Sequence, residues 1–410
     1  MIQNHQKTCG DYLNDKSDYE KAVKSFHEYS SQISYLQNFA GFPIYENCYE
    51  KYLSPGEKKL EALLSELEKA EKYIFLEYFI IGTGVMWSQI FAVLKKKAAQ
   101  GVTVRIIYDD IGCFSRLPKE IYQCLNKYGI ECSVFNPFIP ILTVTQNNRD
   151  HRKIAVIDGK VAFTGGINIG DEYINATDRF GHWKDASIMI KGPAVSSFVI
   201  MFLQMWELCT GTTEDYTRYL SKNEGQSSGG SFIQPYGDSP LDNENVGEHV
   251  YLQIINNAKN YLYIYTPYLI VDDSLISALA LTAKSGVDVR IITPFRYDKK
   301  LVHMTTRSYY RELIMAGVKI FEYSKGFLHA KAFVSDDKIA TVGTGNLDFR
   351  SLYLHFECGT CIYNSPVIRD LKNDFLETQK VCKKITLKDC TPNLAARLFQ
   401  DILRLLAPLM

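Results

Sequence analysis

The sequence lacks an uninterrupted apolar stretch that could cross a bilayer. Such a helix needs about 20 mainly apolar residues, yet the window 73–94 is broken by Glu77 and two glycines, and the window 194–209 is short and amphipathic. The chain also lacks net charge, because its 46 basic residues are balanced by 46 acidic ones. Proteins that bind nucleic acid usually carry an excess of basic residues, so we expect no nucleic acid among the partners.

The ten cysteines lack the compact spacing of a disulfide-bonded secreted domain, and no signal peptide is visible. We therefore expect free thiols in a reducing cytosol. Cys358 and Cys361 have the spacing of a metal or redox pair, but they lie in a strand-like run. A strand places residues three apart on opposite faces, so we interpret both as buried structural cysteines.

An internal duplication is the main feature that the sequence does contain. Residues 150–158 read Asp-His-Arg-Lys-Ile-Ala-Val-Ile-Asp and are followed by Thr-Gly-Gly-Ile-Asn at 164–168. Residues 329–336 read His-Ala-Lys-Ala-Phe-Val-Ser-Asp and are followed by Val-Gly-Thr-Gly-Asn at 342–346. Both copies fit His-x-Lys-x4-Asp with a loop of glycine and asparagine downstream. In a strand the His and Lys of one copy project to the same side, so each copy predicts two cationic side chains at one strand end.

The elements around the two motifs recur in the same order, which indicates a duplicated unit. Apolar runs predict buried strands, and one-faced apolar periodicity predicts the helices between them. The predicted strands are residues 73–79, 101–109, 130–135, 260–265, 286–292 and 317–321. Strands that alternate with helices favour an α/β fold with a mixed sheet flanked by helices in each half.

The chain of 410 residues is long enough for each half to bury its own core. We predict a helical lead-in at 1–42, a first half at 43–212, a linker at 213–231 and a second half at 232–410. The linker contains Glu-Gly-Gln-Ser-Ser-Gly-Gly, a composition typical of exposed connections. The second half ends in an amphipathic helix near Leu394.

Motif and layout together resemble the phospholipase D superfamily, whose members carry paired His-x-Lys-x4-Asp motifs in two similar halves and act on phosphodiesters. The resemblance runs from about Phe42 to the C-terminus, and further matching segments are 182–185, 345–351 and 356–357. Within the superfamily the sequence is most similar to bacterial cardiolipin synthases, through segments 135–137, 265–268 and 405–409. The resemblance implies two halves packed with pseudo-twofold symmetry around one active-site cleft.

The resemblance also implies roles for the motif residues. One histidine attacks phosphorus while the other serves as acid and base; we assign His151 as the nucleophile and His329 as the acid and base, although symmetry allows the reverse. The groups that donate to the phosphate oxygens are Lys153, Lys331, Asn168 and Asn346. Positive charge at these oxygens replaces the metal of other phosphoryl-transfer sites, so we expect neither a metal nor a cofactor.

The acidic residues are expected to act indirectly. Asp185 and Glu357 follow their histidines by 34 and 28 residues, where the resemblance implies acids that fix the imidazole tautomer. Asp158 and Asp336 complete the catalytic motif, but each stands an odd number of residues after its histidine, so strand geometry turns it away. We expect these two aspartates to anchor the motif turn. The isolated histidines are interpreted as structural: His182, His249, His303 and His355.

The function that the resemblance implies is transfer of a phosphatidyl group between two phosphatidylglycerol molecules, which gives cardiolipin and glycerol through a covalent phosphatidyl-histidine. Alternatives are a phospholipase D that uses water and a phosphatidylserine synthase that uses serine. A phospholipase D-type nuclease is disfavoured by the zero net charge, and a non-catalytic membrane-binding protein by the intact motifs. The expected partners are phosphatidylglycerol and anionic membrane lipid; the oligomeric state stays open.

Membrane attachment is expected to be peripheral, on the cytoplasmic side of the cell membrane, because the spanning helices that begin most cardiolipin synthases are not visible. The apolar loop 135–144, directly before the first motif, is one candidate contact, with an ordinary buried loop as the alternative. The C-terminal apolar stripe is another candidate and consists of Leu394, Leu398, Ile402, Leu405 and Leu406. This C-terminal helix could pack against the rest of the protein or lie in the membrane interface.

Overall fold

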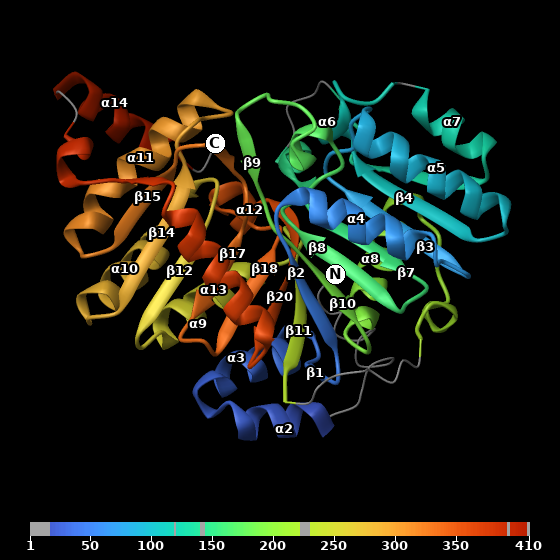
Figure 1. The fold of residues 1–410 in the computed structure, drawn as a ribbon, viewed down its shortest axis with the longest axis horizontal. Helices are drawn as coiled ribbons and strands as arrows, with labels where there is room; N and C mark the ends of the chain where they lie inside the picture. The colour runs from blue at the N-terminus through green and yellow to red at the C-terminus, as the bar shows by residue number, and fades with distance from the viewer. Residues whose placement is uncertain (1–16, 119, 140–143, 222–229, 392–393, 408–410) are drawn as a thin grey trace.

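The computed structural model describes residues 17–118, 120–139, 144–221, 230–391 and 394–407. Within these ranges the chain forms two mixed β-sheets that are flanked by helices (Figure 1). The cyan and green segments lie on the right of this view and the yellow to red segments on the left, so the two halves sit side by side. The predicted α/β class with two similar halves is confirmed.

The first sheet has seven strands and holds the first motif. In order across the sheet they are β2 (Tyr49–Leu53), β10 (Ser187–Lys191), β8 (Val161–Gly165), β7 (Lys153–Ile157), β3 (Tyr73–Tyr78), β4 (Thr103–Asp109) and β5 (Ile130–Phe135). Strands β3, β4 and β5 are parallel, while β7 is antiparallel to β3 and places Lys153 opposite Tyr78. The motif strand therefore begins beside the C-terminal ends of the parallel strands.

The second sheet repeats this arrangement around the second motif. Its strands are, in order, β1 (Tyr45–Glu46), β11 (Phe232–Asp238), β20 (His355–Tyr363), β18 (Ile339–Gly343), β17 (Ala332–Ser335), β12 (Tyr261–Tyr265), β14 (Asp288–Pro294), β15 (Lys319–Tyr323) and β21 (Cys382–Lys384), with β6 (Arg149–Asp150) beside β20. Strands β12, β14 and β15 are parallel, and antiparallel β17 places Ala332 opposite Tyr265. Both motif strands thus begin beside the C-terminal ends of the parallel strands of their own sheet.

Helices cover the faces of both sheets. Those of the first half are α4 (Gly56–Leu67), α5 (Val85–Ala99), α6 (Asp110–Cys113), α7 (Ile121–Lys127) and α8 (Val195–Thr210). Those of the second are α9 (Val246–Asn257), α10 (Asp273–Lys284), α11 (Lys300–Met315), α12 (Phe349–Tyr353), α13 (Pro366–Gln379) and α14 (Leu394–Leu405). Most of α8 is buried, so the window 194–209 is apolar on nearly every side, which corrects its interpretation as amphipathic. No helix in the described ranges is long and apolar enough to span a bilayer.

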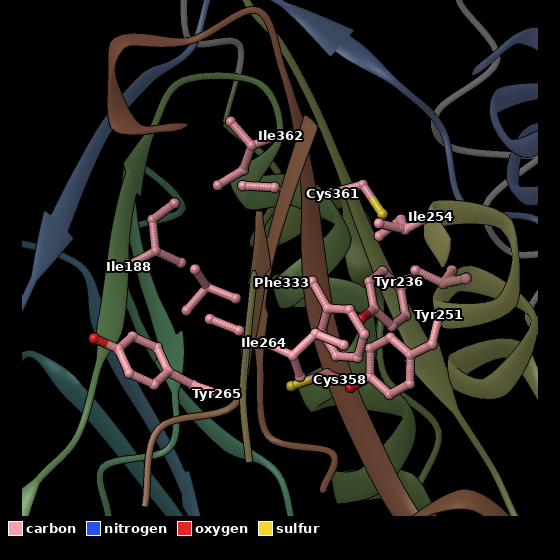
Figure 2. Packing of buried hydrophobic residues seen from close by; sticks show 14 of the residues in the cluster. Ile188, Tyr236, Tyr251, Ile254, Ile264, Tyr265, Phe333, Cys358, Cys361 and Ile362 are labelled. Atoms are coloured by element: carbon pink, nitrogen blue, oxygen red, sulfur yellow. The ribbon is translucent and has the colours of Figure 1, made fainter. Parts of the chain in front are cut away.

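One hydrophobic core joins the two halves. Figure 2 shows part of it, in which Ile188 of β10 belongs to the same packed cluster as Ile264 of β12 and Phe333 of β17. Tyr251 of α9 stacks on Phe333 with ring centroids 4.5 Å apart. Separating the halves would expose this surface at a cost of about 25 cal/mol per Å² of apolar area. The shared core therefore holds the two motifs in one relative position.

The lead-in packs against the second half, far from it in sequence. It is helical in α2 (Ser17–Ser25) and α3 (Ser30–Ser34), and Gln32 donates from Nε2 to the Sγ of Cys361 at 3.2 Å. The sequence assigns residues 43–46 to the first half, whereas β1 pairs antiparallel with β11 of the second sheet. The short strand β2 that follows joins the first sheet, so the chain crosses between the sheets here.

The described cysteines are free thiols, as the sequence predicts. Cys358 and Cys361 are both buried on β20. Burial raises the pKa of each thiol to about 12, so both remain protonated and behave as small apolar side chains. Their interpretation as structural cysteines is confirmed.

Candidate active site

Two short strands are exchanged between the halves, and each leads directly into a motif histidine. The strand β6 precedes His151 and pairs in parallel with the start of β20 in the second half. The strand β16 (Gly326–Leu328) precedes His329 and pairs in parallel with β9 (His182–Lys184) in the first half. The backbone N–H of His151 donates to the carbonyl of Phe356 at 3.0 Å, and that of His329 donates to the carbonyl of Lys184 at 2.7 Å. Each acceptor residue stands immediately before an acid.

This exchange sets the pairing of histidines with acids. His151 Nδ1 lies 2.8 Å from Glu357 Oε1, and His329 Nδ1 lies 2.8 Å from Asp185 Oδ2. The sequence pairs each acid with the histidine that precedes it in the same half, and the structure corrects this: each acid serves the histidine of the opposite half. Spacing along the chain does not reveal the exchange, because it depends on strands that meet only in the folded protein.

Both histidines are neutral and both acids are ionised. Burial lowers the pKa of His329 to about 4 and that of His151 well below its ordinary value. Burial alone would raise the pKa of the Asp185 and Glu357 carboxyls, but the neighbouring histidines and lysines outweigh it, and the net shift is downward. A carboxylate at Nδ1 fixes the tautomer that carries its lone pair on Nε2. Each imidazole therefore presents the form that acts as a nucleophile or a general base.

The motif lysines bring positive charge to the same place. Lys153 donates from Nζ to the backbone carbonyl of His151, and Lys331 to that of His329. Burial lowers the pKa of Lys153 to about 8 and that of Lys331 to about 7. Lys153 further lowers the pKa of Lys331, so the ammonium groups of the two halves act on each other at short range. A bound anion would raise both pKa values and favour the charged lysines.

The two asparagines are buried beside the motifs. Asn168 donates from Nδ2 to the hydroxyl of Tyr173 at 2.8 Å, and its Oδ1 accepts from the backbone N–H of Ile80 at 3.0 Å. Asn346 donates from Nδ2 to Asp348 Oδ2 at 3.0 Å. A primary amide carries two N–H groups, so each side chain keeps one hydrogen beyond these bonds. Their role as phosphate donors stays a prediction.

The motif aspartates stand at the far ends of their strands, away from the histidines. Asp158 accepts from the backbone N–H groups of Glu71, Lys72 and Tyr73, each at 2.8 Å. Asp336 accepts in the same way from residues 259–261, at 2.6 to 2.9 Å. These aspartates join the motif strand to the start of the neighbouring strand. Both aspartates therefore stabilise the fold, and neither lies among the side chains that surround the histidines.

The two histidines differ in what surrounds them. The ring of His329 lies 5.3 Å from that of Trp183 and 5.6 Å from that of Tyr173. The ring of His151 lies 5.0 Å from that of Phe79 and 5.5 Å from that of His355. Trp183 and His355 each stand two residues before the acid of their half, so strand periodicity alone points them to the same side as that acid. The sequence contains this signal, but the position of His355 as an isolated histidine favours a structural interpretation there.

Comparisons with known proteins agree with the duplicated architecture. A family model described as cardiolipin synthase, PLD-like domain, matches residues 63–206 and 251–378. The chain is 40% identical over 362 residues to a cardiolipin synthase of Geobacillus sp. (strain WCH70), which covers 88% of this chain and 72% of that protein. It is 36% identical over 398 residues to cardiolipin synthase 2 of Bacillus anthracis, which covers 96% of this chain and 77% of that protein.

A solved structure also shares the fold. The phosphatidylserine synthase of Haemophilus influenzae Rd KW20 matches with a TM-score of 0.69, over 91% of this chain and 96% of that one. The two sequences are 14% identical. This likeness concerns the fold and leaves the substrate open.

Proposed function

Because this chain belongs to the cardiolipin synthase family of phospholipase D-like phosphatidyltransferases, we propose that it transfers a phosphatidyl group from one phosphatidylglycerol to another. The products are cardiolipin and glycerol. The observation that carries the proposal is the reciprocal pairing of His151 with Glu357 and of His329 with Asp185, with a lysine beside each histidine. This arrangement supplies a nucleophile, an acid and positive charge for a phosphodiester.

The first step forms the covalent intermediate. The Nε2 of His151 attacks phosphorus and forms a P–N bond, while the bond from phosphorus to the glycerol oxygen breaks. Protonated His329 gives its proton to that oxygen, and glycerol leaves. An incoming phosphodiester anion raises the pKa of His329, which supplies the protonated form. Lys153 and Lys331 stabilise the negative charge on the non-bridging oxygens.

The second step regenerates the enzyme. Neutral His329 takes the proton from a hydroxyl of the second phosphatidylglycerol, whose oxygen attacks phosphorus as the P–N bond to His151 breaks. Cardiolipin forms, and His151 returns to its neutral state. Burial lowers the pKa of His151 well below its ordinary value, which supports the unprotonated state that a nucleophile needs.

The main alternative is hydrolysis, in which water replaces the second lipid hydroxyl and the product is phosphatidic acid. The environment of the histidines favours a lipid acceptor, because each is almost fully buried and keeps about 9% of its side-chain surface exposed. An active site that excludes bulk water protects a reactive intermediate from hydrolysis. The same chemistry with serine as acceptor is the second alternative.

Product analysis tests the acceptor. Purified protein incubated with liposomes that contain labelled phosphatidylglycerol, in the presence of EDTA, is expected to form cardiolipin as the main product, with phosphatidic acid as a minor one. Excess glycerol is expected to drive the reaction back toward phosphatidylglycerol. Dominant phosphatidic acid with no response to glycerol would identify a phospholipase D, and activity that returns only with Mg²⁺ or Mn²⁺ would contradict the metal-free mechanism.

We also propose that the C-terminal ends of the parallel strands, beside the histidines, face the membrane. Exposed apolar residues follow the ends of the parallel strands in both halves. After β4 and β5 these are Ile111, Phe114, Phe138 and Ile139, and after β14 they are Phe295, Tyr297 and Leu301. The rings of Phe114 and Phe138 contact each other with centroids 6.0 Å apart. Exposed apolar groups on both sides of a lipid-cleaving site favour lipid as their partner.

The C-terminal helix offers a further contact. Arg404 binds Glu312 of α11 at 3.1 Å and lies over the ring of Tyr309, so α14 packs on the protein. On its other side Leu398, Phe399, Ile402 and Leu405 are exposed. The expected packing helix and the expected interfacial helix are thus compatible with one structure. Leu142 of the loop 135–144, which the sequence also predicts to contact lipid, lies outside the described residues.

Liposome binding tests the membrane face. The double substitution Phe114→Ser and Phe138→Ser is expected to weaken binding to phosphatidylglycerol liposomes roughly 30- to 1,000-fold, because burial of each ring contributes on the order of 1–2 kcal/mol. The control is Leu281→Ser: Leu281 is 64% exposed near the end of α10, which leads into the opposite edge of the second sheet. Equal binding by the double variant, or equal losses in both proteins, would assign membrane contact to another surface.

A further inference from the structure

A histidine beside the proposed nucleophile has a mostly buried side chain whose ring nitrogens lie outside hydrogen-bond geometry. His355 keeps about 10% of its side-chain surface exposed, and within the described residues neither of its ring nitrogens makes a hydrogen bond. Its Nδ1 lies 3.8 Å from Glu357 Oε1, beyond hydrogen-bond range. A buried polar group without a partner is destabilising, and a bound ligand would satisfy it.

The position of His355 completes a set of three metal-ligating groups. His151, His355 and Glu357 each offer one ligand atom, and these atoms all lie within 4.8 Å of one another. Two ligands of one tetrahedral zinc ion lie about 3.3 Å apart when the metal–nitrogen distance is 2.0–2.1 Å. Small side-chain rotations therefore bring all three groups onto one ion. Two imidazoles and a carboxylate with an open fourth position form a well-known zinc ligand set.

The duplication shows that this set is not a general consequence of the fold. In the other half the residue two positions before the acid is Trp183, whose indole lies beside His329 much as His355 lies beside His151. Trp183 donates from Nε1 to Asp185 Oδ2 at 3.4 Å and has no lone pair for a metal. Only one of the two equivalent positions therefore carries a third ligand.

We propose that His151, His355 and Glu357 form an inhibitory binding site for a zinc-like transition-metal ion. The ion takes one nitrogen of each imidazole and one oxygen of the carboxylate. Coordination uses the His151 imidazole that must otherwise attack phosphorus, so the metal-bound enzyme cannot form the covalent intermediate. The ion is bound and released without any change of oxidation state, and a chelator restores the free nucleophile. Hard ions such as Mg²⁺ and Ca²⁺, which prefer oxygen ligands, do not occupy this site.

Direct metal binding is the first test, because it does not depend on any activity. Titration of the purified full chain with Co²⁺ is expected to give the visible absorption bands of a tetrahedral complex at one ion per chain, and Zn²⁺ is expected to displace it. In His355→Gln the affinity is expected to fall at least tenfold, since loss of even an indirect partner of a metal ligand costs about 10- to 100-fold. The control is His249→Gln, because His249 forms an exposed pair with Glu244 at 2.8 Å.

The outcomes of this titration separate the alternatives. Unchanged affinity in His355→Gln, or the absence of a tetrahedral spectrum in the parent protein, overturns the proposal. A loss of affinity in His249→Gln equal to that in His355→Gln also overturns it, because the metal then binds to surface histidines. His355-dependent binding in a protein that makes no cardiolipin would leave the metal site standing and refute the proposed function.

Inhibition is the second test and rests on the proposed function. Micromolar Zn²⁺ is expected to stop turnover of phosphatidylglycerol in the parent protein, and EDTA is expected to restore it. The concentration for half inhibition is expected to rise at least tenfold in His355→Gln, with each protein compared with its own metal-free rate. Equal sensitivity of the two proteins, with metal binding still dependent on His355, would show that the site does not control catalysis.

Discussion

Alanine in place of either His151 or His329 is expected to reduce turnover at least about 10³-fold, and the double variant is expected to be no worse than either single one. Groups that act as one catalytic unit show such non-additive losses. In the proposed mechanism one histidine carries the phosphatidyl group and the other moves the proton, so the reaction stops when either is missing. Turnover with phosphatidylglycerol liposomes measures the effect, and thermal unfolding reports whether the fold is kept.

The matched control is His249→Ala, which removes an exposed histidine that also faces a carboxylate. This variant is expected to retain the parent rate. A single variant at His151 or His329 that keeps more than about a tenth of the parent rate would refute the paired mechanism, because the loss would then be under about 1.4 kcal/mol.

The second large effect on turnover is expected from substitution of the acids that hold the two histidines. Asp185→Asn and Glu357→Gln are each expected to reduce turnover by about 10³- to 10⁴-fold, in line with the loss when the acid behind a catalytic histidine becomes an amide. Both residues are positioning residues, since each acts through the imidazole that it holds. An amide nitrogen in place of the carboxylate oxygen favours the wrong tautomer and leaves the lone pair on Nδ1 instead of Nε2.

The exchange between halves gives this prediction a sharper readout. In protein labelled with ¹⁵N-histidine, Asp185→Asn is expected to shift the ring resonances of His329 and to leave those of His151 unchanged. Glu357→Gln is expected to do the reverse, because the measured contacts are His329 with Asp185 and His151 with Glu357. Spectra of the two alanine variants assign the signals.

The opposite NMR pattern would contradict the exchanged strands. If Asp185→Asn perturbed His151 instead, each half would hold its own pair, as spacing along the chain suggests. Equal perturbation of both histidines would indicate a general loss of structure, and the unfolding temperature of the variants would show the same loss.

Much of the local structure could be predicted from the sequence because it depends on neighbouring residues. The strand predicted at 130–135 has these bounds in β5, and the strand predicted at 73–79 is β3 with one residue fewer. A short, mainly apolar run predicts a strand whatever the rest of the chain does. The odd spacing of Asp158 and Asp336 from their histidines likewise predicts that they turn away, and both bind backbone N–H groups at the far end of the motif strand.

The arrangement between the halves could not be predicted in the same way. The helical lead-in and the strand β1 pack on the second sheet, although they precede the first half in the chain. A contact between Gln32 and Cys361 spans 329 positions. Local patterns show which faces are apolar but not which distant face covers them, because apolar burial has no direction of its own.

The sequence by itself determined the duplicated motif, the residues proposed to carry the chemistry and the strand ends from which they project. All of these follow from periodicity and from side-chain chemistry. Only the tertiary structure decided which acid holds which histidine, and it placed His355 beside His151 where the other half has Trp183 beside His329. The reason is physical: β6 and β16 are paired with strands of the opposite half, and backbone hydrogen bonds between distant strands form only when both halves pack on their shared core.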